Sequence, residues 1–160
     1  MIRSRSFLSG TVLAAVLAAT IPGSARAELP QDQAERAVET RQSVLHLMAW
    51  NMAPLGAMAR DRIEFDGERV TTNADRLLAL SKMLSDAFGP DTRGNDVETE
   101  ALDVIWENPE DFAAKVQANI DAATALVEIS ASGDEGAIKE AIGRLGSTCG
   151  SCHDDFRVDD

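Results

Sequence analysis

Apolar residues recur along the chain at spacings of three and four, and no stretch alternates between apolar and polar residues with a period of two. This pattern predicts helices and no strands. Four long helices are expected: Pro30 to about Ala59, Thr71 or Thr72 to Phe88, Asn108–Pro109 to beyond Val127, and a last one after Ser132–Gly133 that carries Ile138 to Phe156. Residues 89–108 form a long connection with a short apolar piece at 101–106.

Apolar stripes of this kind are typical of helices that pack side by side. A chain of 160 residues is most consistent with one domain. The sequence therefore predicts an all-α fold, an antiparallel left-handed four-helix bundle.

The N-terminal segment is typical of a secretory signal peptide. Arg3 and Arg5 precede an apolar run over residues 7–21, and Ala25-Arg26-Ala27 fits a cleavage site. We expect residues 1–27 to be removed and residues 28–160 to form the exported domain. An uncleaved membrane anchor is the alternative, although the run is shorter than the ~20 residues that a spanning helix needs.

The charge of the chain restricts its partners. Fifteen Lys and Arg stand against 27 Asp and Glu, and removal of residues 1–27 takes away three arginines and no acid, which leaves a charge of −15. Such a charge argues against nucleic acid and anionic lipid as partners. The remaining chain has no second apolar run to hold it in a membrane, and its two cysteines exclude a disulfide-rich scaffold.

Both cysteines stand in the sequence Cys149-Gly150-Ser151-Cys152-His153, a C-x-x-C-H motif that is the attachment signature of c-type haem. Residues i, i+3 and i+4 share one face of a helix. Two thiols at this spacing can therefore meet the two vinyl groups of one porphyrin as thioethers, and His153 can then reach the iron. We predict one covalently attached haem c, with Cys149 and Cys152 as attachment points and His153 as the metal ligand.

Two other functions of the motif are possible. An exported C-x-x-C can be a thiol–disulfide exchange pair, but such pairs usually open a helix after a strand, where the helix N-terminus lowers the thiol pKa. A zinc site would need four ligands, and only these three residues and the distant His46 are present.

A four-helix bundle with C-x-x-C-H near its C-terminus resembles cytochrome c′, the class II c-type cytochromes. Further matches are Asp154-Asp155-Phe156-Arg157, the run Arg41 to Leu45 followed by Met48, Phe88-Gly89-Pro90 and Ile105-Trp106. The resemblance implies that Cys149 and Cys152 are thioether-linked and that His153 is the proximal ligand. It also places Arg157 on the proximal side, Arg41 and Gln42 at the haem propionates, and Thr99 and Glu100 at a further haem contact.

The position of Arg41 in the sequence also indicates a binding residue, independently of the resemblance. It stands on an otherwise apolar stripe, where a guanidinium needs an anion beside it. A propionate would supply that anion. The alternative is that Arg41 reaches solvent and pairs with Glu39 or Asp32.

The residue at the sixth coordination position decides the function that the resemblance implies. Leu45 stands where six-coordinate, low-spin relatives have a methionine, and leucine cannot bind iron. A five-coordinate, high-spin iron with an apolar distal face would bind nitric oxide and carbon monoxide and pass one electron, without enzymatic turnover. The distal face is expected to contain Leu45, Met48, Leu84 and Phe88. The alternatives are Met48 or His46 as a sixth ligand.

Helix Pro30–Ala59 has a second apolar stripe, which consists of Val44, Leu47, Trp50, Asn51 and Pro54. A helix that is apolar on two faces is usually buried on both. We expect this stripe to contact a second copy in a homodimer; a thicker monomer core is the alternative. The other expected partner is an unidentified periplasmic redox protein, for which the acidic charge favours a basic surface.

Overall fold

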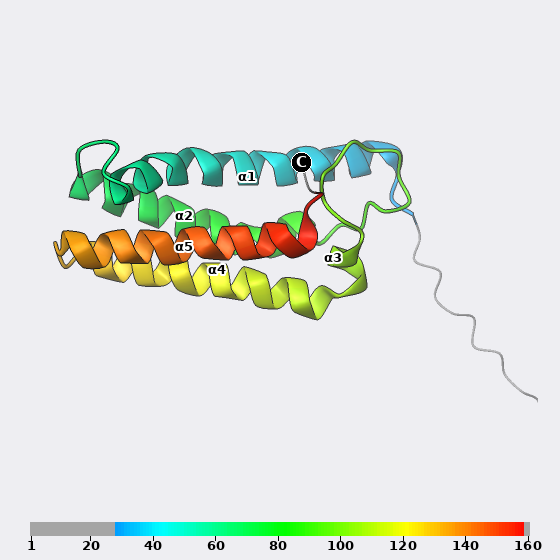
Figure 1. Ribbon diagram of the computed structural model, residues 1–160. Helices are drawn as coiled ribbons and strands as arrows, with labels where there is room; N and C mark the ends of the chain where they lie inside the picture. Colours follow the sequence, from blue (N-terminus) through cyan, green and yellow to red (C-terminus); the bar gives the residue numbers. More distant parts are fainter. Residues whose placement is uncertain (1–27, 159–160) are drawn as a thin grey trace, which may run out of the picture.

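The computed structural model describes residues 28–158, so the predicted signal peptide lies outside the described residues. The long helices are α1 (Gln31–Ala59), α2 (Gly67–Phe88), α4 (Pro109–Ser130) and α5 (Glu135–Phe156), and a short α3 (Val104–Glu107) lies in the connection between α2 and α4. The long helices form an antiparallel four-helix bundle (Figure 1). The predicted all-α fold is confirmed, and the described residues form no strand beyond one isolated bridge.

Local sequence signals explain where three of these helices begin. Pro30 precedes α1, and its carbonyl accepts hydrogen bonds from the amides of Gln33 and Ala34. Pro109 is the first residue of α4, where its missing N–H costs nothing. The side chain of Asp134 caps α5 by accepting from the amide of Ala137 at 3.0 Å. These starts agree with the sequence pattern.

The start of α2 differs from the prediction. We expected Thr71 or Thr72 as the N-cap, but the N-cap lies five or six residues earlier, where Asp66 accepts from the amide of Arg69 at 2.9 Å. The first turn is polar and exposed, so it adds nothing to the apolar stripe from which the prediction was made. Val70 is the first buried residue of this helix.

The core is made by one face of each long helix. Its largest fully buried side chains are Leu55, Met58, Val70, Leu77, Leu126, Ile138, Ile142 and Leu145. No helix among the described residues is both long and apolar enough to cross a bilayer.

The second apolar stripe of α1 is divided by the fold. Val44 and Asn51 are buried within the subunit, because α2 packs on this side and Asn73 donates to the carbonyl of Asn51 at 2.9 Å. Leu47 and Trp50 remain exposed, Trp50 by 68%. The expectation of one continuous outer stripe was therefore wrong, and only its exposed members are available to a partner.

The long connection is attached to the end of α5. Ala101 and Arg157 form an antiparallel bridge, the amide of Leu102 donates to Phe156, and the amide of Val158 donates to Glu100. These bonds fix residues 156–158, which end and follow the last turn of α5, against the connection. That turn contains the motif residues nearest the C-terminus.

Candidate functional site

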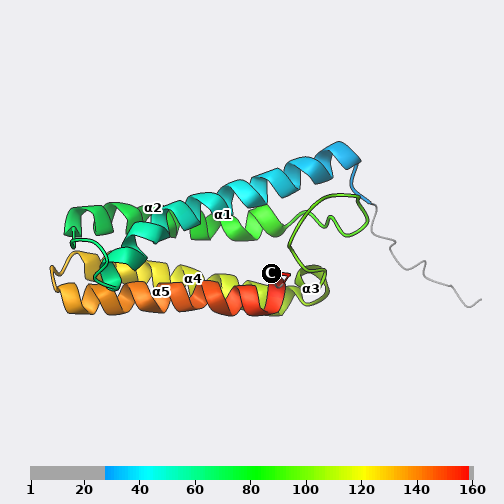
Figure 2. The same ribbon diagram turned by 45° about the horizontal axis from the view of Figure 1, so that its top comes forward.

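The C-x-x-C-H motif occupies the last two turns of α5. His153 and Gly150 are exposed, while both thiols are partly buried. A methyl group placed on Gly150 would meet nothing within 4 Å, and one on Gly146 would meet the terminal carbon of Met52 in α1 at 3.5 Å. Helical spacing places Gly146, Gly150 and His153 on one stripe of α5. Because Gly146 lies against Met52, this stripe faces α1. In Figure 2 the N-terminal half of α1 rises away from α5 at this end of the bundle.

The environment of the thiols does not favour thiolate. Burial raises the pKa of Cys149, although hydrogen bonds from Asn119 and Thr148 act in the opposite direction. Burial, followed by the neighbouring Cys149, raises the pKa of Cys152. The pair lies at the C-terminal end of its helix, where the helix dipole disfavours a negative charge. An exchange-active thiol needs the opposite setting.

A buried polar network reaches Cys149 from α2 and α4. The hydroxyl of Ser81 donates to Oδ1 of Asn119 at 2.7 Å, and Nδ2 of Asn119 donates to Thr148 Oγ1 at 2.8 Å and to Cys149 Sγ at 3.8 Å. Asn119 is 5% exposed and Ser81 is fully buried. The sequence analysis missed both residues. The signal available was a polar residue at a helical spacing that places it on the buried face of each helix.

Lys115, one turn before Asn119, holds the same segment of α5. Its ammonium donates to the carbonyl oxygen of Ser151 at 3.1 Å and to its hydroxyl at 2.6 Å, and it forms an ion pair with Asp155 at 2.7 Å. The hydrogen bond to Asp155 raises the pKa of Lys115 above its ordinary value. Ser151 lies between the two cysteines, and Asp155 follows His153 by two residues. The sequence analysis did not identify Lys115.

Arg41 is 2% exposed, so the alternative in which it reaches solvent was wrong. Its guanidinium donates to Ala87 O at 2.9 Å, to Thr92 Oγ1 at 3.0 Å and to the carbonyl of Pro90. It also lies 4.9 Å from the ring centre of Trp106. Burial lowers the pKa of Arg41, and the nearby Asp91 acts against this effect.

These contacts connect α1 to the end of α2 and to the connection. They use three of the five N–H donors of the guanidinium, so up to two remain for a propionate. The pairing with Asp32 that we considered is not formed, since Asp32 pairs with Arg36. Gln42, the other predicted propionate contact, is exposed beside Arg41.

Arg157 and Glu100 are brought together at the end of α5. Nε of Arg157 donates to Glu100 Oε2 at 2.7 Å. Thr99 lies beside this pair and accepts from the amide of Ala101 at 3.2 Å. Three residues that the resemblance places near the haem thus lie together at the C-terminal end of α5.

The predicted distal residues differ in exposure. Leu45 is 36% exposed, an unusual exposure for a leucine on the apolar stripe of a helix, whereas Met48 and Leu84 are buried in the core. Phe88 is half-buried, with its ring centre 5.0 Å from that of Phe112. His46 is exposed on α1.

The arrangement fits a flat, largely apolar group held at α5. Two thiols and an exposed imidazole share one face, a glycine beside them leaves open space, and Leu45 offers apolar surface on α1. A zinc site needs a cluster of about four ligands. Among residues 28–158, no group of three or more His, Cys, Asp or Glu side chains is placed to hold a metal ion.

Known proteins with similar sequences point to one family. The family model of cytochrome c′ matches residues 36–157. Cytochrome c′ of Cereibacter sphaeroides is 38% identical over 149 residues, which cover 92% of this chain and 97% of the relative.

Two solved structures show the same fold. One is the nitric oxide complex of a leucine-to-alanine variant of cytochrome c′ from Alcaligenes xylosoxidans, with 30% identity, a TM-score of 0.72 and coverage of 79% of this chain and 97% of that one. The other is a cytochrome c′ with ligand-controlled dimer dissociation, with 31% identity, a TM-score of 0.72 and coverage of 83% and 100%. The cofactor of this family is covalently attached haem c, and this chain has the two cysteines that the attachment needs. The chain belongs to the cytochrome c′ family.

Proposed function

We propose that the protein is a periplasmic haem protein with a five-coordinate iron, which binds nitric oxide and carbon monoxide and carries single electrons without enzymatic turnover. Cys149 and Cys152 would hold the haem covalently, and His153 would bind its iron. The haem supplies an iron that binds a diatomic gas or exchanges one electron. The N-terminal 27 residues direct export to the periplasm.

The observation that carries this proposal is the nature and exposure of Leu45. It lies two helical turns before Met52, the α1 residue whose side chain approaches Gly146 of α5. It has no atom that can coordinate iron, and it is more exposed than its neighbours on the apolar stripe. An apolar side chain at the open side of the iron admits small neutral gases and offers no hydrogen bond to water or anions. The solved nitric oxide complex of a relative supports the same ligand class.

A second candidate is a six-coordinate, low-spin electron carrier that uses Met48. Met48 is buried and belongs to the core cluster, which supports a packing role. His46 is about 100° around the helix from Leu45, so it does not share the direction of that side chain. The raised pKa of both thiols disfavours the third candidate, a thiol–disulfide oxidoreductase.

An absorption spectrum of the reduced protein, before and after carbon monoxide, tests the proposal. We expect a broad high-spin Soret band that sharpens with the gas. A sharp band that carbon monoxide does not change would overturn the open site and favour Met48, which the Met48→Leu variant would then test. Absence of haem after expression in a host able to attach it would overturn the whole proposal. His153→Ala should abolish normal ligation.

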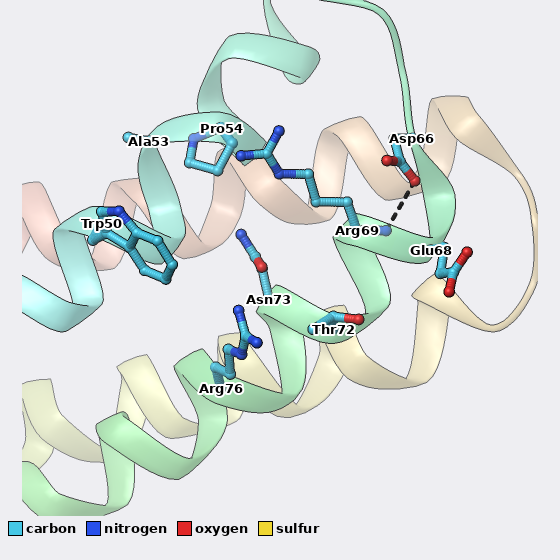
Figure 3. Close-up of a pocket in the computed structure, with 9 residues that line it drawn as sticks. All are labelled: Trp50, Ala53, Pro54, Asp66, Glu68, Arg69, Thr72, Asn73 and Arg76. Carbon is cyan, nitrogen blue, oxygen red and sulfur yellow. Dashed lines mark hydrogen bonds between the residues drawn. The ribbon is translucent and has the colours of Figure 1, made fainter.

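We also propose a homodimer through the α1–α2 face. Leu47 and Trp50 on α1 and Met83 on α2 are exposed there. A neighbouring hollow of about 510 Å³ is lined by Trp50, Ala53, Pro54, Asp66, Glu68, Arg69, Thr72, Asn73 and Arg76, all from α1, α2 and the end of their loop (Figure 3). The dimer known for a relative supports a second copy as the partner.

Sedimentation velocity of the purified holoprotein tests the dimer. Trp50→Glu places a charge on the proposed interface and should yield monomer with unchanged helicity. Gln117→Glu introduces the same charge on the exposed side of α4 and should remain dimeric. A wild-type protein that sediments as a monomer at all concentrations would disprove this part of the proposal.

A further inference from the structure

The side-chain amide of Asn119 has a defined orientation in its hydrogen-bond network, and the proposed haem attachment explains that orientation. The Asn119 side chain has one acceptor oxygen and an NH2 group with two donors. The oxygen accepts from Ser81, and the two donors point to Thr148 and Cys149. Thr148 and Cys149 in turn point their own hydrogens at the carbonyl of Leu145, at 2.7 and 3.5 Å.

A free thiol would also tolerate the opposite orientation of this amide. Ser81 lies 2.8 Å from the carbonyl of Leu77 and can donate there instead, which would leave its oxygen free to accept from Asn119. The Asn119 oxygen would then accept from the hydroxyl of Thr148 and the thiol of Cys149. While Cys149 carries a hydrogen, the Asn119 side chain can therefore form a hydrogen bond with the sulfur in either orientation.

Attachment of haem removes this choice. When the thiol adds across a vinyl group, the S–H bond breaks, a carbon–sulfur bond forms and the hydrogen goes to the other vinyl carbon, so no oxidant or reductant is needed. A thioether sulfur is an acceptor only. An amide oxygen facing it would receive no hydrogen from the sulfur and would keep only Thr148 as a donor, whereas the N–H of Asn119 remains a good partner for the sulfur.

We propose that Asn119 is a positioning residue for the haem, which holds the Cys149 thioether by an N–H···S hydrogen bond while Ser81 fixes the direction of its amide. This inference rests on the proposed thioether at Cys149. The bond connects the haem to α2 and α4 through side chains that are buried on all sides. No other described residue makes a side-chain hydrogen bond from another helix to either cysteine.

The test compares Asn119→Leu with Thr148→Val in the ferric holoprotein. The first removes the donor to sulfur, and the second removes a hydroxyl from the same network but keeps that donor. Each is also made with Cys149→Ala, in which haem is attached through Cys152 alone. We expect Asn119→Leu to raise the unfolding equilibrium constant about tenfold with Cys149 present and about threefold with Cys149→Ala.

A spectroscopic readout separates positioning from packing. Asn119→Leu should change the circular dichroism of the Soret band and the carbon–sulfur vibrations in resonance Raman spectra, and Thr148→Val should leave both unchanged. Equal effects of Asn119→Leu in the two backgrounds, with an unchanged Soret band, would overturn the inference. A protein mass without haem would instead overturn the proposed function, so the two failures are distinguishable.

Discussion

The ammonium of Lys115 in α4 donates to both oxygens of Ser151, the residue between the two cysteines of α5. Its third contact, to Asp155, lies on the same side of α5 one turn later. One cation thus uses all three of its donors on the segment that carries the haem ligands. Lys115 and Asn119 are four residues apart, so α4 holds this segment with neighbouring side chains.

We predict that Lys115→Met loosens the haem-binding segment and lowers the reduction potential of the iron. The substitution keeps the aliphatic stem but removes a positive charge and leaves Asp155 unpaired. Amide exchange in residues 149–156 should become severalfold faster, and a potentiometric titration should give a lower midpoint.

Lys139→Met is the matched control for Lys115. Lys139 also pairs with two carboxylates, Asp61 and Glu135, but near the other end of α5. The Lys139→Met variant should leave the reduction potential of the iron and the amide exchange of residues 149–156 unchanged. Equal shifts in potential for the two variants would contradict a local effect of Lys115.

Arg41→Met should lower the free energy of unfolding by about 2–4 kcal/mol, because it leaves buried acceptors at Ala87 and Pro90 without their donor. Guanidinium chloride unfolding followed by circular dichroism measures this loss. Arg36→Met, on the same helix but in an exposed pair with Asp32, should change stability little. A small effect of Arg41→Met would mean that the connection is held by other contacts.

Leu45→Ala and Leu45→Met should change the distal side in opposite ways. The smaller side chain should speed carbon monoxide binding to the reduced protein, measured by stopped flow. The thioether of Met should supply a sixth ligand and give a sharp, low-spin spectrum with weaker carbon monoxide binding. If neither variant changes the spectrum or the on-rate, Leu45 does not face the iron.

The two thiols should react slowly in chain that carries no haem. Their pKa values lie above the ordinary value of 9.0, so little thiolate is present at neutral pH. Iodoacetamide labelling of folded chain should be slower than that of a cysteine peptide at pH 8. A faster rate would support thiol–disulfide chemistry.

The same shift fixes the sign of a pH effect on haem-free chain. Above pH 9 the folded state keeps thiol protons that the unfolded state releases. The free energy of unfolding should therefore fall as the pH rises through and above about 9. Cys149→Ser with Cys152→Ser should remove this slope.

The sequence predicts those features that depend on local spacing. Stripes at three and four residues identified every long helix, and the motif around Cys149 and His153 identified the cofactor that the family comparison supports. Contacts between helices were beyond this reasoning. Lys115 resembles an ordinary surface charge in the sequence, and its partners are defined only when α4 packs on α5. Asn119 lies on the buried face of α4, but the sequence does not show which residues of α2 and α5 it contacts.

Exposure was equally hard to predict on α1. Val44 and Leu45 are adjacent apolar residues, and only the packing of α2 determines that Val44 is buried while Leu45 is not. Arg41 shows the same limit, since its unusual position in the stripe was recognised but its partners come from the far end of α2 and the connection.

The start of α2 gives a final prediction in which sequence and structure disagree. Asp66→Ala should lower the free energy of unfolding by about 1 kcal/mol, because the Asp66 carboxylate satisfies the otherwise unpaired amide of Arg69. Thr71→Ala should have little effect, since Thr71 lies inside the helix and bonds only back to Gly67 in its first turn. Thermal unfolding of the two variants measures the difference. A larger loss of stability for Thr71→Ala would support Thr71 as the N-cap, as the apolar stripe predicts.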